Sequence, residues 1–256
     1  MAHDPTTLND HDVAALLATE AGEVLVSLRA ELHAQGIDGR ELKDAGDQAA
    51  HNFLMERIAA LRLDDAVLSE EGKDDKARLD AERIWIIDPL DGTREFSEVP
   101  RTDWAVHVAL VANESPIAGA VALPALGTTL HTGKPPSLVA EPSDPPRMIV
   151  SRSRPPEAAL HVAQALGADL VEMGSAGAKA MAVVRGECEM YVHSGGQYEW
   201  DSCAPVAVAA AAGCHVSRID GSPLKYNQDD VYLPDLVICR PELAEATLAA
   251  LADFGS

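Results

Sequence analysis

The most informative stretch of this chain is Ile86-Ile87-Asp88-Pro89-Leu90-Asp91-Gly92-Thr93-Arg94-Glu95-Phe96. Its apolar start predicts a strand that carries Asp88 to its end, where Pro89 forces the chain out of the ladder. Asp91 follows three residues later, so the two carboxylates can converge on one point. Close carboxylates repel each other unless a cation lies between them. With the Leu90 carbonyl, they form an all-oxygen ligand set suited to Mg²⁺.

The next two residues add a place for an anion. Gly92 and Thr93 open a short helix or turn, whose free N–H groups could hold a phosphate. A lone Asp-x-x-Asp pair is more often a solvated turn. The prediction of a metal and phosphate site therefore depends on the whole run and on its place after a strand.

Composition narrows the possible functions. The 256 residues carry a formal net charge of −21 and are 47% apolar, which predicts one large domain or two lobes with a real core. Such an acidic chain argues against binding a nucleic-acid polymer or an anionic membrane. We find no basic signal-peptide region and no apolar run of roughly 20 residues, so we expect a cytoplasmic protein. The cysteines form no Cys-x-x-Cys pair and are expected to be buried free thiols rather than disulfides or a zinc site.

The first half of the chain predicts helices followed by strands. One helix is expected from Asn9 or Asp10 to about residue 34, and a second from near Gly46-Asp47. Strands are predicted at 66–68 and 84–87, an antiparallel hairpin at 104–112 and 117–123, and a further strand at 128–131. The proline-rich stretch 134–147 is expected to separate an N-terminal α+β lobe, residues 1–140, from a C-terminal lobe, residues 147–256.

The second half alternates strands and helices, which predicts an α/β lobe. The expected strands are 148–150, 170–173, 189–193, a segment around Val216, and 236–239. The expected helices are 157–166, 176–185, 201–212 and a last one opened by Pro241.

Four motifs resemble one enzyme superfamily. Asp88-Pro89-Leu90-Asp91-Gly92-Thr93 resembles the signature of the inositol monophosphatase superfamily of metal-dependent, lithium-sensitive phosphatases. In the order of that family, Asp47-Gln48-Ala49-Ala50, Ser69-Glu70-Glu71-Gly72 and Trp200-Asp201-Ser202-Cys203-Ala204-Pro205 match its other motifs. The resemblance implies a layered α-β-α-β-α sandwich with the site between the two lobes, where the C-terminal lobe supplies Asp201 and the specificity residues.

The resemblance also implies a set of metal ligands. Glu70, Asp88 and the Leu90 carbonyl would hold one Mg²⁺. Asp88, Asp91 and Asp201 would hold a second, and a third, weaker ion would depend mainly on Glu70 and water. Taken singly, Glu70 with its neighbour would be a solvated acidic pair, and Asp201 would be a helix N-cap.

The catalytic roles that the resemblance implies fall on Asp47 and Thr93. Both would hydrogen-bond the nucleophilic water, and Asp47 would accept its proton through the Thr93 hydroxyl. The N–H groups of Gly92 and Thr93 would bind phosphate oxygens. By itself, Asp47 would be a residue that caps a helix, and the role of Glu71 stays open.

Three further segments resemble the 3'(2'),5'-bisphosphate nucleotidase (CysQ-type) branch. They are the run from Asp91 to Phe96, the pair Ser151-Arg152, and Gly174-Ser175 followed by Lys179. The expected substrate contacts are Gly92, Thr93, Ser151, Arg152, Gly174, Ser175, Lys179 and Asp201. The segment from Gly174 to Lys179 is one residue longer than the branch pattern, and Arg154 replaces a histidine. Arg152 and Lys179 could equally be surface charges, and Tyr198 or Trp200 could stack on adenine or pack in the core.

The implied activity is Mg²⁺-dependent hydrolysis of 3'-phosphoadenosine 5'-phosphate to AMP and phosphate, which would clear a by-product of sulfate assimilation. The alternative is an inositol-1-phosphate or fructose-1,6-bisphosphate phosphatase on the same scaffold. An alternative of another class is a non-catalytic metal- or nucleotide-binding protein. A small phosphorylated molecule is the expected partner, and a homodimer is possible because many relatives form one.

Overall fold

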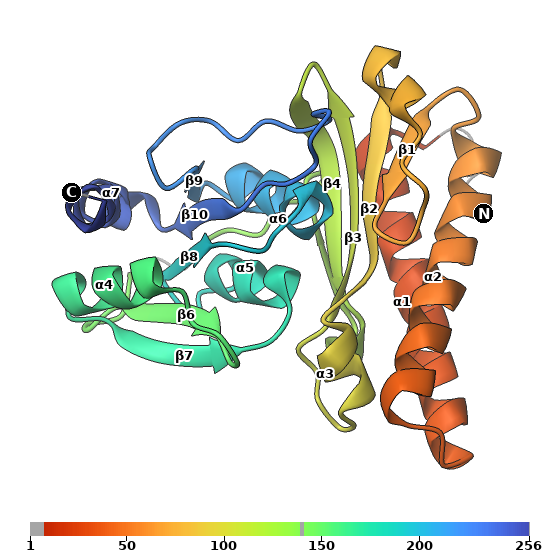
Figure 1. The fold of residues 1–256 in the computed structure, drawn as a ribbon, viewed down its shortest axis with the longest axis horizontal. Helices are drawn as coiled ribbons and strands as arrows, with labels where there is room; N and C mark the ends of the chain where they lie inside the picture. The colour runs from red at the N-terminus through yellow and green to blue at the C-terminus, as the bar shows by residue number, and fades with distance from the viewer. Residues whose placement is uncertain (1–7, 139–140, 256) are drawn as a thin grey trace.

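Two five-stranded sheets organise the chain in the computed structural model, which describes residues 8–138 and 141–255 (Figure 1). The first sheet has the order β1-β2-β3-β4-β5, and the second has the order β7-β6-β8-β10-β9. The strands of the first sheet are β1 (Ala66–Ser69), β2 (Ile84–Asp91), β3 (Ala105–Ala112), β4 (Ser115–Leu123) and β5 (Thr128–His131). Those of the second are β6 (Arg147–Ser151), β7 (Asp169–Met173), β8 (Met190–Ser194), β9 (His215–Ser217) and β10 (Asp235–Cys239).

The helices form three layers, one between the two sheets and one on the outer face of each sheet. The first sheet is covered on one face by α1 (Asp10–Ala34) and α2 (Gly39–Leu61), and α5 (Ala176–Val184) and α6 (Glu199–Ala211) lie between the sheets (Figure 1). The outer face of the second sheet carries α4 (Glu157–Leu166) and α7 (Ala244–Phe254). Short pieces complete the chain: α3 (Thr93–Ser97), η2 (Lys76–Asp80), η3 (Pro124–Leu126) and η4 (Pro241–Leu243). The expected α-β-α-β-α sandwich is confirmed.

The apolar pattern explains where the core lies. In α1, the side chain of Asn9 caps the helix by accepting from the backbone N–H of Asp12 at 3.0 Å. Val13, Leu17 and Leu25 then face the first sheet with no exposed surface. A second apolar cluster fills the space between the sheets, and a third lies under α4 and α7. All four cysteines are free and buried, as expected.

The second helix begins earlier than the sequence suggested. It starts at Gly39, not near Gly46-Asp47, so Gly46 lies inside it. A Cβ at Gly46 would come within 2.7 Å of the Phe96 ring and 2.9 Å of Leu90. The glycine therefore allows α2 to approach the end of β2 and α3 closely; it does not start the helix.

Two other boundaries differ slightly from the sequence prediction. Helix α6 begins at Glu199, two residues before the expected start, and Pro241 opens the short η4 turn ahead of α7. The chain crosses from the first sheet to the second within residues 132–146, of which 139 and 140 lie outside the described part. A division into two lobes at that segment stays a prediction. The sequence predicted no membrane-spanning segment. Among the described helices, none is long and apolar enough to cross a membrane.

Strand β2 delivers the acidic motif. All eight of its residues are buried, and it pairs in parallel with β1 and antiparallel with β3. The strand runs on to Asp91, and Pro89 interrupts it only locally: the pairing with β3 shifts between Asp88 and Asp91. The sequence predicted that the strand would end at Asp88, and this boundary was wrong; the two carboxylates nevertheless lie close together, as expected.

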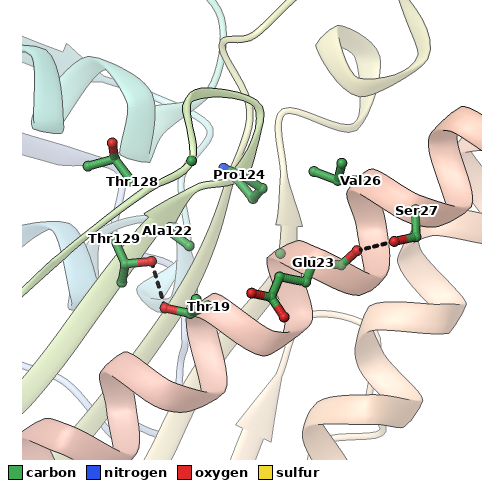
Figure 2. Close-up of a pocket in the computed structure, with 10 residues that line it drawn as sticks. Thr19, Glu23, Val26, Ser27, Ala122, Pro124, Thr128 and Thr129 are labelled. Atoms are coloured by element: carbon green, nitrogen blue, oxygen red, sulfur yellow. Dashed lines mark hydrogen bonds between the residues drawn. The ribbon is translucent and has the colours of Figure 1, made fainter.

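A pocket of about 280 Å³ lies on the face of the first sheet that α1 covers, away from the second sheet (Figure 2). It is lined by Thr19 and Glu23 of α1, by Pro124 of η3 and by Thr129 of β5. The hydroxyl groups of Thr19 and Thr129 are 2.7 Å apart across it. Because α1 covers the face opposite α6, this pocket is not part of the acidic site.

Candidate active site

Three carboxylates from two layers meet between the sheets. Asp88 and Asp91 come from the end of β2, and Asp201 comes from the first turn of α6. Each offers an oxygen atom, and these oxygens all lie within 4.8 Å of one another. The first two side chains are buried, and Asp201 is partly exposed. Such a group of hard oxygen donors is typical of a site for Mg²⁺ or a similar cation.

Glu70 joins this group from the neighbouring strand. It follows β1, whose carboxyl end lies beside that of β2 because the two strands are parallel. Although the residue is exposed overall, surrounding protein withdraws its carboxyl group from water and raises its pKa to about 7, while a hydrogen bond with Asp88 opposes the shift. Burial, followed by repulsion from Glu70 and Asp91, also raises the pKa of Asp88 well above its ordinary value. A bound cation would relieve this repulsion, so the acidic group fits a metal.

Asp91 is held differently from its neighbours. Its carboxylate accepts hydrogen bonds from the Ser175 hydroxyl and from the backbone N–H groups of Ala176 at 3.0 Å and Gly177 at 2.7 Å. Its Oδ2 also lies 3.2 Å from Nε2 of His107. Burial alone would raise the pKa of Asp91, but the contacts with His107 and Ser175 outweigh it and hold the pKa well below its usual range. Asp91 is therefore ionised before any metal binds.

Thr93 and Asp47 lie together at the edge of the acidic group. The Thr93 side chain hydrogen-bonds Asp47 of α2, and its hydroxyl also lies 3.2 Å from the carbonyl oxygen of Leu90. Burial, then repulsion from Glu71, raises the pKa of Asp47 to about 7. Gly92, the residue before Thr93, has φ +83°, in the left-handed region that glycine adopts without strain. The hydroxyl and carboxyl pair expected from the sequence is thus assembled.

Asp201 has two roles in the structure. Its carboxylate accepts a hydrogen bond from the backbone N–H of Tyr198 at 2.7 Å, so it supports the start of α6 from the third helical position while facing the acidic group; the N-cap residue itself is Tyr198. Burial, then repulsion from Asp91, raises its pKa to about 7. The Tyr198 ring stacks on Trp200 with ring centres 5.0 Å apart, and Tyr198 is 42% exposed. Of the two aromatic residues, Tyr198 offers the accessible ring.

The two expected substrate cations already have partners within the protein. Arg152 pairs with Glu95 at 2.7 Å and Glu98 at 2.9 Å. Lys179 is buried, donates to the carbonyl oxygen of Ser175 at 2.6 Å, and lies 5.3 Å from the centre of the Tyr191 ring. Because Lys179 is buried, it is not the ordinary surface charge of the alternative interpretation, whereas Arg152 is partly exposed and forms ion pairs. Their expected contact with a nucleotide stays a prediction.

The remaining expected contacts are Gly174, which lies against Glu95 of α3, and Ser151 at the end of β6. Gly174 donates its backbone N–H to Asp103 at 2.7 Å, and a Cβ there would lie 2.2 Å from Cδ of Glu95. The Ser151 hydroxyl accepts from the backbone N–H of Arg154 at 3.3 Å. Sequence reasoning missed Asp103 and His107 as parts of this region, and it gave Glu95 no role beyond its place in the run from Asp91 to Phe96, because only their partners in the fold distinguish them from other polar residues.

A sandwich of three helical layers and two sheets, with a buried carboxylate group beside a paired hydroxyl and carboxyl, defines a metal-dependent phosphatase. The inositol monophosphatase family model matches residues 9–255, and the chain belongs to this family. It is 50% identical to the 3'-phosphoadenosine 5'-phosphate phosphatase of Mycobacterium leprae (strain TN), over 96% of this chain and 94% of that protein.

Two further relatives agree with this family. The 3'(2'),5'-bisphosphate nucleotidase CysQ of Escherichia coli (strain K12) is 32% identical over 74% of this chain and 81% of its own. The crystal structure of CysQ from Bacteroides thetaiotaomicron, a bacterial member of the inositol monophosphatase family, superposes with a TM-score of 0.74. That comparison has 26% identity and covers 91% of this chain and 98% of the other.

Proposed function

We propose that this protein hydrolyses the 3'-phosphate of 3'-phosphoadenosine 5'-phosphate to give AMP and phosphate, with Mg²⁺ as cofactor. The observation that carries the proposal is the convergence of Asp88, Asp91 and Asp201 on one point. The choice of substrate is supported by the half-identical relative that is named for this reaction.

The proposed ligands divide between two ions. Glu70, Asp88 and the Leu90 carbonyl would hold one Mg²⁺, and Asp88, Asp91 and Asp201 would hold the other. A third ion near Glu70 belongs to the same proposal. Bound Mg²⁺ would supply the charge that acidifies a water molecule and neutralises phosphate oxygens.

The protein's own groups would orient the water and move its proton. The Thr93 hydroxyl would accept a hydrogen bond from the water and pass the proton towards the Asp47 carboxylate. A carboxyl group with a pKa near 7 suits this task, because it can both accept and release a proton at neutral pH. The N–H groups of Gly92 and Thr93 would orient the phosphate.

The nucleotide would lie where α3 and the loop after it meet the ends of β6 and β7, at the contacts of Glu95 with Arg152 and of Asp103 with Gly174. Arg152 and Ser151 would approach it from the end of β6, and the exposed Tyr198 ring offers a surface for the base. Gly174, Ser175 and Lys179 complete the proposed substrate site. Because Ser175 bonds Asp91 and Lys179 bonds Ser175, these two residues would also hold the metal ligand in place.

Phosphate release tests the proposal directly. The purified protein is assayed with Mg²⁺ on 3'-phosphoadenosine 5'-phosphate, inositol 1-phosphate and fructose 1,6-bisphosphate, and again after chelation. We expect the nucleotide to be hydrolysed fastest, no turnover without metal, and inhibition by millimolar Li⁺. Much faster release from inositol 1-phosphate would overturn the substrate assignment, and no release from any of the three would favour a non-catalytic binding protein.

A pair of variants tests the metal site. Asp91→Asn should lose most turnover and keep its fold, because it removes a charged ligand but keeps the shape of the side chain. Asp169→Asn changes an exposed aspartate on β7 and serves as the matched control. Near wild-type activity in Asp91→Asn would exclude the two-ion arrangement.

A further inference from the structure

His107 is a fully buried histidine in β3 that touches both elements of the acidic group. Its Cα is paired with that of Asp88 in the sheet register. On one side of the ring, Nδ1 lies 3.0 Å from the carbonyl oxygen of Trp200, to which it donates. On the other side, Nε2 lies 3.2 Å from Oδ2 of Asp91. The imidazole therefore spans the gap between β2 and α6.

This bridge joins two proposed metal ligands that no continuous element connects. Asp91 ends a strand of the first sheet, whereas Asp201 follows Trp200 in a helix between the sheets. Their separation must match one ion, because Mg²⁺ demands nearly ideal geometry at short distances. A rigid ring that contacts Asp91 and the residue before Asp201 fixes that separation.

Gly177 shows how closely the ring is held. A Cβ at this position would lie 2.0 Å from Nε2 of His107, so the imidazole occupies the space of the missing side chain. The backbone N–H of Gly177 also donates to the same Asp91 oxygen at 2.7 Å. The first turn of α5 thus presses the ring and the carboxylate together from a third side.

We propose that His107 is a positioning residue that sets the spacing of Asp91 and Asp201, and through it the affinity for Mg²⁺, without touching metal or substrate. The inference rests on the proposed function for the identity of the ligands. Outer partners of metal ligands typically change metal affinity or activity by about 10- to 100-fold when they are replaced.

The test measures Mg²⁺ binding by calorimetry on the full-length protein without substrate. His107→Asn can keep only the bond to Trp200, and His107→Gln can reach only Asp91, so each breaks the bridge on one side. We expect both to bind Mg²⁺ about 10- to 100-fold more weakly. At saturating Mg²⁺, the KM for the nucleotide should stay near that of the wild type.

Val111→Ala is the matched control. Val111 lies in β3, is fully buried in the same core between the sheets, and belongs to neither proposed site. It should lower thermal stability and leave Mg²⁺ affinity unchanged. If the His107 variants behave as this control does, the histidine is a packing residue and the proposal is wrong. If the wild type binds Mg²⁺ but does not hydrolyse the nucleotide, the proposed function fails while this measurement still decides the role of His107.

Gly177→Ala gives a second route that does not alter the histidine. Its methyl group must displace the ring, so we expect it to weaken Mg²⁺ binding as well. In the double variant His107→Ser with Gly177→Ala, the smaller side chain leaves room for the methyl group. The double variant should therefore bind Mg²⁺ no more weakly than the worse single variant. Additive losses would show that the two residues act independently and would contradict the bridge.

Discussion

Replacing Asp201 with asparagine should stabilise the metal-free protein at alkaline pH, although the change removes a proposed metal ligand. Burial, together with repulsion from Asp91, raises the pKa of Asp201 from 3.8 to about 7. Between these values the folded protein holds a proton that the unfolded chain has released. The contribution of Asp201 to the free energy of unfolding therefore falls as pH rises through this range, and it is lowest above pH 7.

The size of the effect follows from the two pKa values. Each unit of pKa difference corresponds to about 1.4 kcal/mol. The raised pKa of Asp201 therefore lowers the free energy of unfolding by about 4 kcal/mol above pH 7. Because Asp201 is partly exposed, screening by water reduces this figure, and we expect roughly 2 to 4 kcal/mol. Asparagine keeps an amide oxygen that can accept from the N–H of Tyr198, so the cap of α6 should be retained.

Urea unfolding in the presence of a chelator measures this difference. At about pH 8 the free energy of unfolding of the variant should exceed that of the wild type by roughly 2 to 4 kcal/mol. At about pH 5 the difference should be less than half as large. Added Mg²⁺ should reverse the order, because it binds the folded wild type more tightly than the variant. A variant that is less stable than the wild type at pH 8 without metal, or a difference independent of pH, would refute the electrostatic reasoning.

Three further changes test other parts of the site. Asp47→Asn should lower turnover by roughly 10²- to 10⁴-fold with little change in calorimetric Mg²⁺ affinity; a loss of metal binding would instead make Asp47 a ligand. Gly174→Ala should raise the KM for the nucleotide, because its Cβ would displace the Glu95 carboxylate that Arg152 binds; an unchanged KM would argue against this part of the substrate site. The four cysteines are buried and burial raises the pKa of each thiol, so a thiol reagent should label them slowly in the folded protein and rapidly in urea. Rapid labelling of the folded protein would contradict their placement.

The acidic residues of the candidate site could be predicted because each follows a local pattern. Asp88 and Asp91 are fixed by an apolar strand and a proline, and Glu70 follows a second strand that runs parallel to the first. Asp201 lies in the first turn of a helix, and the start of a helix can be predicted from the sequence to within a few residues. Their convergence was inferred from the order of the family's motifs, since strand ends and helix starts alone do not specify which of them meet.

The supporting residues could not be predicted for a physical reason. His107 lies inside an apolar strand, and its function depends on contacts with residues that are 16 and 93 positions away in the chain. Gly46 has the local appearance of a helix start, and only its closeness to Phe96 explains a glycine within α2. Secondary-structure propensity and hydrophobic periodicity depend on residues that are close together in the chain, so they do not predict contacts between distant segments.

The charges around the site suggest why a metal is needed to attract an anionic substrate. The chain has a net charge of −21, and the two cations expected to bind the substrate already have partners: Arg152 with Glu95 and Glu98, and Lys179 with backbone carbonyls. Asp91 is held ionised by its own hydrogen bonds. A phosphate that approached the metal-free site would therefore meet repulsion, whereas bound Mg²⁺ would reverse the local charge. We accordingly expect metal to bind before the nucleotide, and nucleotide binding to the chelated protein to be undetectable by calorimetry; tight binding without metal would contradict this order.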